Sequence, residues 1–94
     1  MDFIHSREFL KQGDTVVLDC DTQCNFMLTD DANFANYKRG GAFRYLGGHY
    51  KYFPASVTAP SPGYWNITID LGGGASNIHY GLRVIKADDP SFHT

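Results

Sequence analysis

Apolar and polar residues alternate in short segments along much of this chain. The clearest alternation covers Tyr64–Leu71, and a second alternating segment covers Asn77–Lys86. A period of two places apolar side chains on one face of a β-strand and polar ones on the other. Each segment therefore predicts a strand, and we expect the two to form a hairpin that brings Asp70 beside His79.

Further strands are predicted where β-branched and aromatic residues gather between turn residues. Thr15–Cys20 and Asn25–Thr29 are two such strands, and the short polar link between them predicts a turn that joins them. Ala42–Phe53 holds two aromatic runs on either side of Gly47-Gly48, which is a typical hairpin pattern. Ser56–Ala59 predicts one more short strand.

The predicted hairpin at Gly47-Gly48 has a specific register. A two-residue loop would place Arg44 directly opposite Lys51, and like charges in that position repel each other. An anion between the two side chains would remove this repulsion. One face of the hairpin would carry the aromatic residues Phe43, Tyr45, Tyr50 and Tyr52, and the other would carry Arg44, Leu46, His49 and Lys51.

One short helix is predicted near residues 31–39. Acidic residues at its start, Lys38 and Arg39 in its last turn and a glycine just past its end match the preferences of helix termini. Phe34 and Tyr37 are three residues apart, so both should face the core.

About seven short strands and one helical excursion predict an all-β fold, a jelly-roll-like or immunoglobulin-like β-sandwich. The 94 residues suffice for one domain with a modest core. We expect a single sandwich over residues 1–86, a flexible glycine-rich loop at 72–76 and a flexible C-terminal tail at 87–94.

The charge distribution along the chain suggests where a binding site could lie. The net charge of −2 argues against strong non-specific nucleic-acid binding, yet residues 32–69 contain four cationic side chains and no acidic one. This segment could bind an anionic small molecule or an acidic partner surface. The alternative is a solvated edge whose charges balance the acidic first third of the chain. The predicted site residues are Lys38, Arg39, Arg44, His49 and Lys51.

Catalysis is not predicted, because no nucleophile or metalloprotease motif connects the cysteines, histidines and aspartates. The spacing of Cys20 and Cys24 is compatible with one half of a zinc site, but no second Cys or His pair completes it. Buried structural thiols are therefore favoured, and no cofactor is expected. A thiol- or metal-dependent enzyme at these two residues is the less favoured alternative. Tyr45, Tyr50 and Tyr52 could instead form the interface of a homodimer.

The location of the protein is predicted from what the chain does not contain. It has no apolar run long enough for a membrane helix and no basic, apolar leader at its N-terminus. Two cysteines in such a chain are expected to be free thiols. We therefore expect a cytoplasmic protein without a membrane partner.

Several motifs, taken in order, resemble a known family. They are Phe3-Ile4-His5-Ser6-Arg7-Glu8, Val16-Val17-Leu18-Asp19-Cys20-Asp21, Asp30-Asp31-Ala32-Asn33-Phe34 with Tyr37 and Arg39-Gly40-Gly41, Gly47-Gly48-His49, and Gly63-Tyr64-Trp65-Asn66 leading into Asp70-Leu71-Gly72-Gly73-Gly74. With them, residues 1–85 resemble a bacterial family of domains of unknown function, number 1883 in its series. The resemblance implies an all-β fold and no particular activity. Relatives that carry the domain beside a TIR-like domain imply a sensing or docking role.

Overall fold

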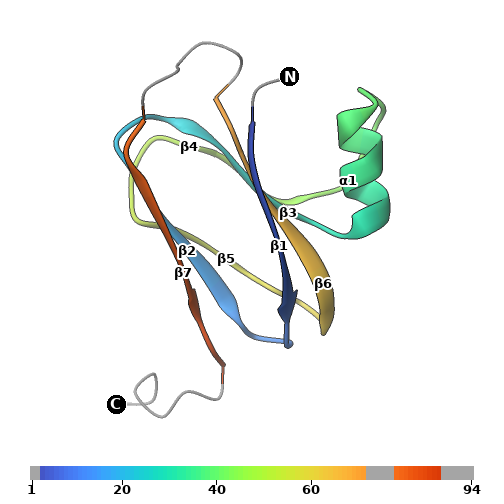
Figure 1. Cartoon of the computed structure of the whole chain (residues 1–94). Helices are drawn as coiled ribbons and strands as arrows, with labels where there is room; N and C mark the ends of the chain where they lie inside the picture. The colour runs from blue at the N-terminus through green and yellow to red at the C-terminus, as the bar shows by residue number, and fades with distance from the viewer. Residues whose placement is uncertain (1–2, 72–77, 88–94) are drawn as a thin grey trace.

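The computed structural model describes residues 3–71 and 78–87. Its strands form two antiparallel sheets, with one short helix beside the larger sheet (Figure 1). The four-stranded sheet has the order β1 (Phe3–Leu10), β6 (Gly63–Asp70), β3 (Cys24–Thr29) and β4 (Leu46–Tyr50). The three-stranded sheet has the order β5 (Ala55–Thr58), β2 (Thr15–Cys20) and β7 (Tyr80–Ile85). The predicted all-β sandwich is confirmed.

The main core lies between the two sheets. Its buried side chains come from both sheets, which is why alternate residues of each strand are apolar. Trp65, Leu82 and Val84 are partly buried against this core, as their alternation predicts. The fully buried members include Val16, Leu18, Phe26, Leu28 and Ile69.

Nearly every connection in the chain crosses from one sheet to the other. Of the strands that follow one another in the described sequence, only β3 and β4 lie in the same sheet, and α1 (Asp31–Lys38) separates them. The predicted turn from Thr15–Cys20 into Asn25–Thr29 is therefore a crossover and not a hairpin. An alternating pattern identifies the face that a strand buries but not the strand beside it.

The predicted hairpin at Gly47-Gly48 is wrong, because both glycines lie inside β4. Gly47 pairs with Met27 and Gly48 with Phe26 of β3. Gly47 has a φ of +105°, and a Cβ there would lie 2.1 Å from the carbonyl oxygen of Phe26. Glycine is required here by a close backbone approach within a strand, and not by a turn.

This result also removes the predicted register around the glycines. Arg44 precedes β4 and Lys51 follows it, so the two residues are not cross-strand neighbours. The expected aromatic face is divided as well, because Tyr45 and Tyr52 are exposed whereas Phe43 and Tyr50 are half-buried.

The predicted hairpin between Asp70 and His79 is also wrong. Asp70 on β6 lies between Phe3 of β1 and Asn25 of β3, whereas β7 pairs with β2 in the other sheet. His79 instead donates its backbone N–H to Oδ1 of Asp21, at 3.1 Å. The carboxylate beside this histidine therefore comes from the end of β2.

The predicted helix is confirmed. Asp30 caps it by accepting the backbone N–H of Asn33 at 2.8 Å, and Phe34 and Tyr37 are buried in a second cluster with Met27. Strand β1 has no counterpart among the predictions, because both of its faces mix apolar and polar residues. The predicted loop at 72–76 and, apart from residue 87, the predicted tail lie outside the described residues.

Candidate ligand-binding site on the outer face of the larger sheet

The outward face of β6 is polar but buried in its middle. Asn66 and Thr68 are each 1% exposed, although their alternation with Ile67 and Ile69 indicates a face turned toward solvent. Helix α1 packs against β6 and β3 and covers this face. The sandwich therefore has a third layer locally, and polar groups lie inside it.

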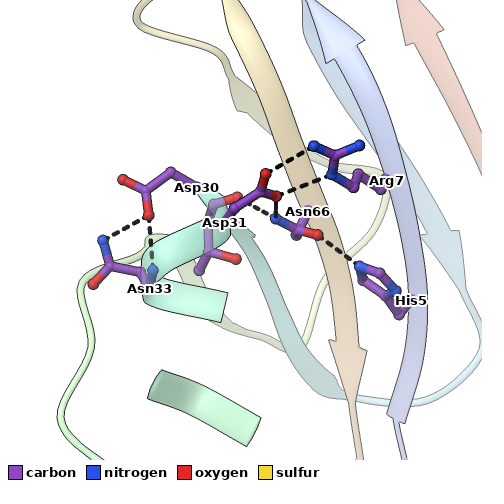
Figure 2. A network of polar contacts seen from close by, with 7 residues as sticks. His5, Arg7, Asp30, Asp31, Asn33 and Asn66 are labelled. Atoms are coloured by element: carbon purple, nitrogen blue, oxygen red, sulfur yellow. Dashed lines mark hydrogen bonds and ion pairs between the residues drawn. The ribbon is translucent and has the colours of Figure 1, made fainter. Parts of the chain in front are cut away.

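Asn66 is the centre of a hydrogen-bond network beneath the start of the helix (Figure 2). Its Nδ2 donates to Oδ1 of Asp31 at 2.8 Å and to the carbonyl of Thr29 at 3.3 Å. Its Oδ1 lies 2.8 Å from Nε2 of His5 on β1. These bonds join α1, β3, β6 and β1, and they satisfy a buried amide that would otherwise be costly.

Arg7 extends this network to the edge of the sheet (Figure 2). Its guanidinium donates twice to Asp31, from Nε at 3.0 Å and from Nη2 at 2.8 Å, and it also lies 4.1 Å from the centre of the Tyr64 ring. The hydrogen bond from Arg7, followed by that from Asn66, lowers the pKa of Asp31 to about 2. Charge and geometry therefore fix the first turn of α1 on the sheet.

A second set of hydrogen bonds fixes the segment that follows the helix. Asn33 donates its Nδ2 to Oδ1 of Asp30 at 2.9 Å, and its own Oδ1 accepts the backbone N–H of Arg44 at 2.7 Å. The helix cap therefore holds the chain just before β4 in place. This positions the side chains of Phe43, Arg44 and Tyr45 beside α1.

Two hollows share Tyr45 as a lining residue. The first has a volume of about 330 Å³, with Tyr37, Phe43 and Tyr45 among its lining residues together with the polar residues Asn25 and Asp70. The Phe43 ring lies 5.2 Å from that of Tyr37 and 5.4 Å from that of Tyr45. An aromatic row therefore continues from the buried cluster to the surface.

Tyr37 and Asp70 form a short polar contact at this first hollow. The Tyr37 hydroxyl donates to Oδ2 of Asp70 at 2.5 Å. Burial, together with this carboxylate, raises the pKa of Tyr37 well above its ordinary value. Tyr37 is therefore a neutral donor that holds the carboxylate in place.

The second hollow has a volume of about 190 Å³, and Tyr45 is also among its lining residues. Within the described residues, the guanidinium of Arg44 has no hydrogen-bond or ion-pair partner. Thr29 also lines this hollow, and its buried hydroxyl lacks a partner in the same part of the chain. Leu28, Leu46 and Trp65, which belong to or pack against the main core between the sheets, also line this hollow.

All five predicted site residues are exposed, but only Arg44 lines one of these hollows. Lys38 lies over the Phe34 ring at 4.9 Å, and Arg39 donates to Oδ1 of Asn36. His49 lies 3.2 Å from Oδ1 of Asn25, which lines the first hollow. Of the five, Arg44 lines the second hollow, whereas Lys51 lies past the end of β4.

The two cysteines lie at the crossover between the sheets. Both are free, Cys24 is buried, and Cys20 is half-buried. Burial, followed by the neighbouring Cys20 thiol, raises the pKa of Cys24 to about 12, so this thiol stays protonated. Across residues 3–71 and 78–87, no three His, Cys, Asp or Glu side chains lie close enough to hold a metal ion.

Several residues at the first hollow are not among the five predicted site residues. The sequence pattern places Asn25 in a strand, Tyr37 in the core face of a helix and Asp70 in a hairpin, and only the register of the strands and the packing of α1 bring them together. The alternating pattern identifies Asp70 as an outward position of its strand. The pattern does not identify the residues beside Asp70 on the neighbouring strand and helix.

Comparisons with known proteins identify a family but no characterised relative. Neither a curated protein nor a solved structure gives a significant match. In the described part of the chain, no helix is long and apolar enough to cross a membrane. A family model described as a domain of unknown function, DUF1883, matches residues 1–89, and the chain therefore belongs to this family.

Proposed function

We propose that this chain is a non-catalytic binding module for an anionic small molecule or an acidic partner surface. The observation that carries the proposal is Arg44, an exposed cation that lines a hollow and has no partner among the described residues. Lys38, Arg39 and His49 lie on the helix and the strand that flank the same region. Residues 32–69 supply no acidic side chain to neutralise them.

The positive charges have a functional explanation on this surface. An unpaired guanidinium beside aromatic walls can donate two parallel hydrogen bonds to a carboxylate or a phosphate. The fixed position of the Arg44 backbone, held by Asn33, reduces the conformational entropy lost on binding. A small anion and an acidic protein surface would both pair with these cationic side chains. The size of the molecule that binds distinguishes the two.

The test is thermal unfolding at low salt with citrate and pyrophosphate as separate probes. A ligand at about 100 times its Kd should stabilise the protein by about 2.7 kcal/mol. Arg44→Ser should remove this stabilisation, whereas Arg83→Ser removes one exposed cation from the smaller sheet and should keep it. No stabilisation by either anion, or an equal loss in both variants, would show that the proposal is wrong.

A second candidate function is self-association. Tyr52 is 87% exposed and Tyr45 50% exposed, and they lie just outside the two ends of the edge strand β4. Exposed tyrosines beside an open strand edge are typical of protein interfaces. Light scattering should detect a dimer that Tyr52→Asp dissociates. Tyr50 is unsuitable for this test because it packs against the main core.

A further inference from the structure

The first hollow combines aromatic walls with one negative charge. Its volume of about 330 Å³ lies within the range of small-molecule pockets, about 300–1,000 Å³. Among the described residues that line it, Asp70 is the one charged side chain, and none is basic. The lining residues are Asn25, Met27, Tyr37, Phe43, Tyr45, Gly48 and Asp70. This lining favours a cationic ligand over an anionic one.

Three aromatic rings line the hollow and are inclined to one another. The plane of the Phe43 ring makes an angle of 68° with that of Tyr37 and of 42° with that of Tyr45. Tyr37 is buried, Phe43 is half-buried and Tyr45 is 50% exposed, so the rings extend from the inside of the hollow to its rim. Aromatic faces attract a cation within about 6 Å, and several rings around one site are typical of quaternary ammonium recognition.

The Asp70 carboxylate is held in place at the same hollow. On β6 it lies between Phe3 of β1 and Asn25 of β3, and its Oδ2 accepts the Tyr37 hydroxyl at 2.5 Å. A hydroxyl is a neutral donor, so it fixes the carboxylate without cancelling the negative charge. The hollow therefore presents a preorganised negative charge to a ligand.

The scarcity of polar groups in the hollow indicates which kind of cation fits. A primary ammonium has three N–H donors, and each needs an acceptor when water is displaced. Besides Asp70, the lining side chains offer the carboxamide of Asn25, whose Oδ1 already lies 3.2 Å from Nδ1 of His49. A quaternary ammonium has no N–H group and needs only aromatic or apolar surface and a nearby negative charge. Met27 adds to that apolar surface.

The basic residues near the hollow do not line it. Nζ of Lys38 lies 4.9 Å from the centre of the Phe34 ring, and Arg39 donates to Asn36. Exposed charges of this kind are screened over about 8 Å at physiological ionic strength. A carboxylate in the wall acts on the ligand at contact distance, so its attraction outweighs their repulsion.

We propose that the first hollow binds a small trimethylammonium compound of the choline type. The rings of Tyr37, Phe43 and Tyr45 contact the methyl groups, and Asp70 balances the positive charge. The inference goes beyond the proposed function, because this ligand has the opposite charge and Arg44 does not line its site. Binding involves no chemical step.

The test is NMR titration of the full chain with choline at physiological ionic strength. The amide signals of Asn25 and Gly48 should shift and reach saturation. The uncharged analogue of choline, in which a tert-butyl group replaces the trimethylammonium group, should bind at least about tenfold more weakly. Equal binding of this analogue would overturn the recognition of a cation.

Substitutions at the rim and in the wall locate the site. Tyr45→Ala should weaken choline binding about fivefold or more, whereas Tyr45→Phe should keep the affinity because the ring and not the hydroxyl attracts the cation. Asp70→Asn should weaken it about tenfold, since the amide oxygen can still accept the Tyr37 hydroxyl but carries no charge. Tyr52→Ala is the matched control, because this exposed tyrosine does not line the hollow. An equal loss in Tyr52→Ala and Tyr45→Ala would overturn the assigned site.

A further variant separates this inference from the proposed function. Arg44→Ser should leave choline binding unchanged while it removes stabilisation by citrate and pyrophosphate. Stabilisation by these anions without any binding of choline would overturn the trimethylammonium site and leave the anion-binding function in place. Choline binding without stabilisation by either anion would have the reverse meaning.

Discussion

Asn66 on β6 donates its Nδ2 to Oδ1 of Asp31, the first residue of α1, at 2.8 Å. This bond connects the middle of the larger sheet to the helix that forms one wall of the candidate site (Figure 2). Because Asn66 is 1% exposed, water cannot replace its partners. The helix is therefore held by a buried amide as well as by its two aromatic side chains.

Asn66→Ala should lower the free energy of unfolding by about 2–3 kcal/mol. The substitution leaves the buried carbonyl of Thr29 without the Asn66 donor, and a buried polar group left unsatisfied costs about 1–3 kcal/mol. It also removes the hydrogen bonds from Asn66 to Asp31 and His5. Urea denaturation measures this change. Gln12→Ala, at an exposed position between β1 and β2, is the control and should change stability by less than about 0.5 kcal/mol.

Thr68→Val should raise the free energy of unfolding, in contrast to Asn66→Ala, although Thr68 lies on the same face two residues further along β6. Its hydroxyl is buried and has no partner within the described residues. Replacing it with a methyl group of similar size removes an unsatisfied polar atom and should stabilise the protein by about 1 kcal/mol. A loss of stability in urea would show that the hydroxyl is satisfied, for instance by water.

The ion pair between Arg7 and Asp31 should make stability depend on pH in the acidic range. Hydrogen bonds lower the pKa of Asp31 to about 2 in the folded state, from an ordinary value of 3.8. The unfolded chain therefore binds the proton more tightly, and the stabilisation is complete above about pH 5 and is lost as the pH falls toward 2.

Unfolding measured in urea between pH 2 and 6 tests this dependence. Asp31→Asn should flatten the profile, and Arg7→Gln should flatten it in part because Asn66 still donates to the carboxylate. The two substitutions together should cost less than the sum of their separate effects. Strict additivity would contradict a coupled pair.

Asp14 should stabilise the fold through backbone hydrogen bonds rather than through its ion pair. The carboxylate is fully buried and accepts the backbone N–H groups of Lys11 and Ala87, each at 2.8 Å, while Nζ of Lys86 lies 3.5 Å away. Asp14→Ala should cost about 3 kcal/mol, because both amides lose a charged acceptor. Lys86→Met, which removes a half-exposed cation, should cost less than about 1 kcal/mol. The reverse order in chemical denaturation would refute this assignment.

Gly47→Ala should be among the most damaging single changes in the larger sheet. The new Cβ would lie 2.1 Å from the carbonyl oxygen of Phe26, at a φ that side chains rarely adopt. Strain and displacement of the backbone should together cost about 3 kcal/mol or more. Gly81→Ala on β7 meets no atom within 4 Å and should stay within about 0.5 kcal/mol. Thermal unfolding of both variants makes the comparison.

The sequence by itself determined the local elements of this protein. The alternation over Tyr64–Leu71 and the β-branched run Thr15–Cys20 are strands, and the capping residues around 30–39 mark the helix. These features follow from periods and propensities that act within a few residues. The basic character of residues 32–69 and the family resemblance also needed no structure.

Only the tertiary structure decided which elements are neighbours. A polar link or a Gly-Gly pair has the same local preferences in a hairpin, in a crossover or inside a strand, so three hairpins were predicted that do not exist. Pairing is selected by burial summed over distant segments, which no short window contains. For the same reason, the polar face of β6 became buried when α1 packed on it, and Asn25, Tyr45 and Asp70 came together at one hollow.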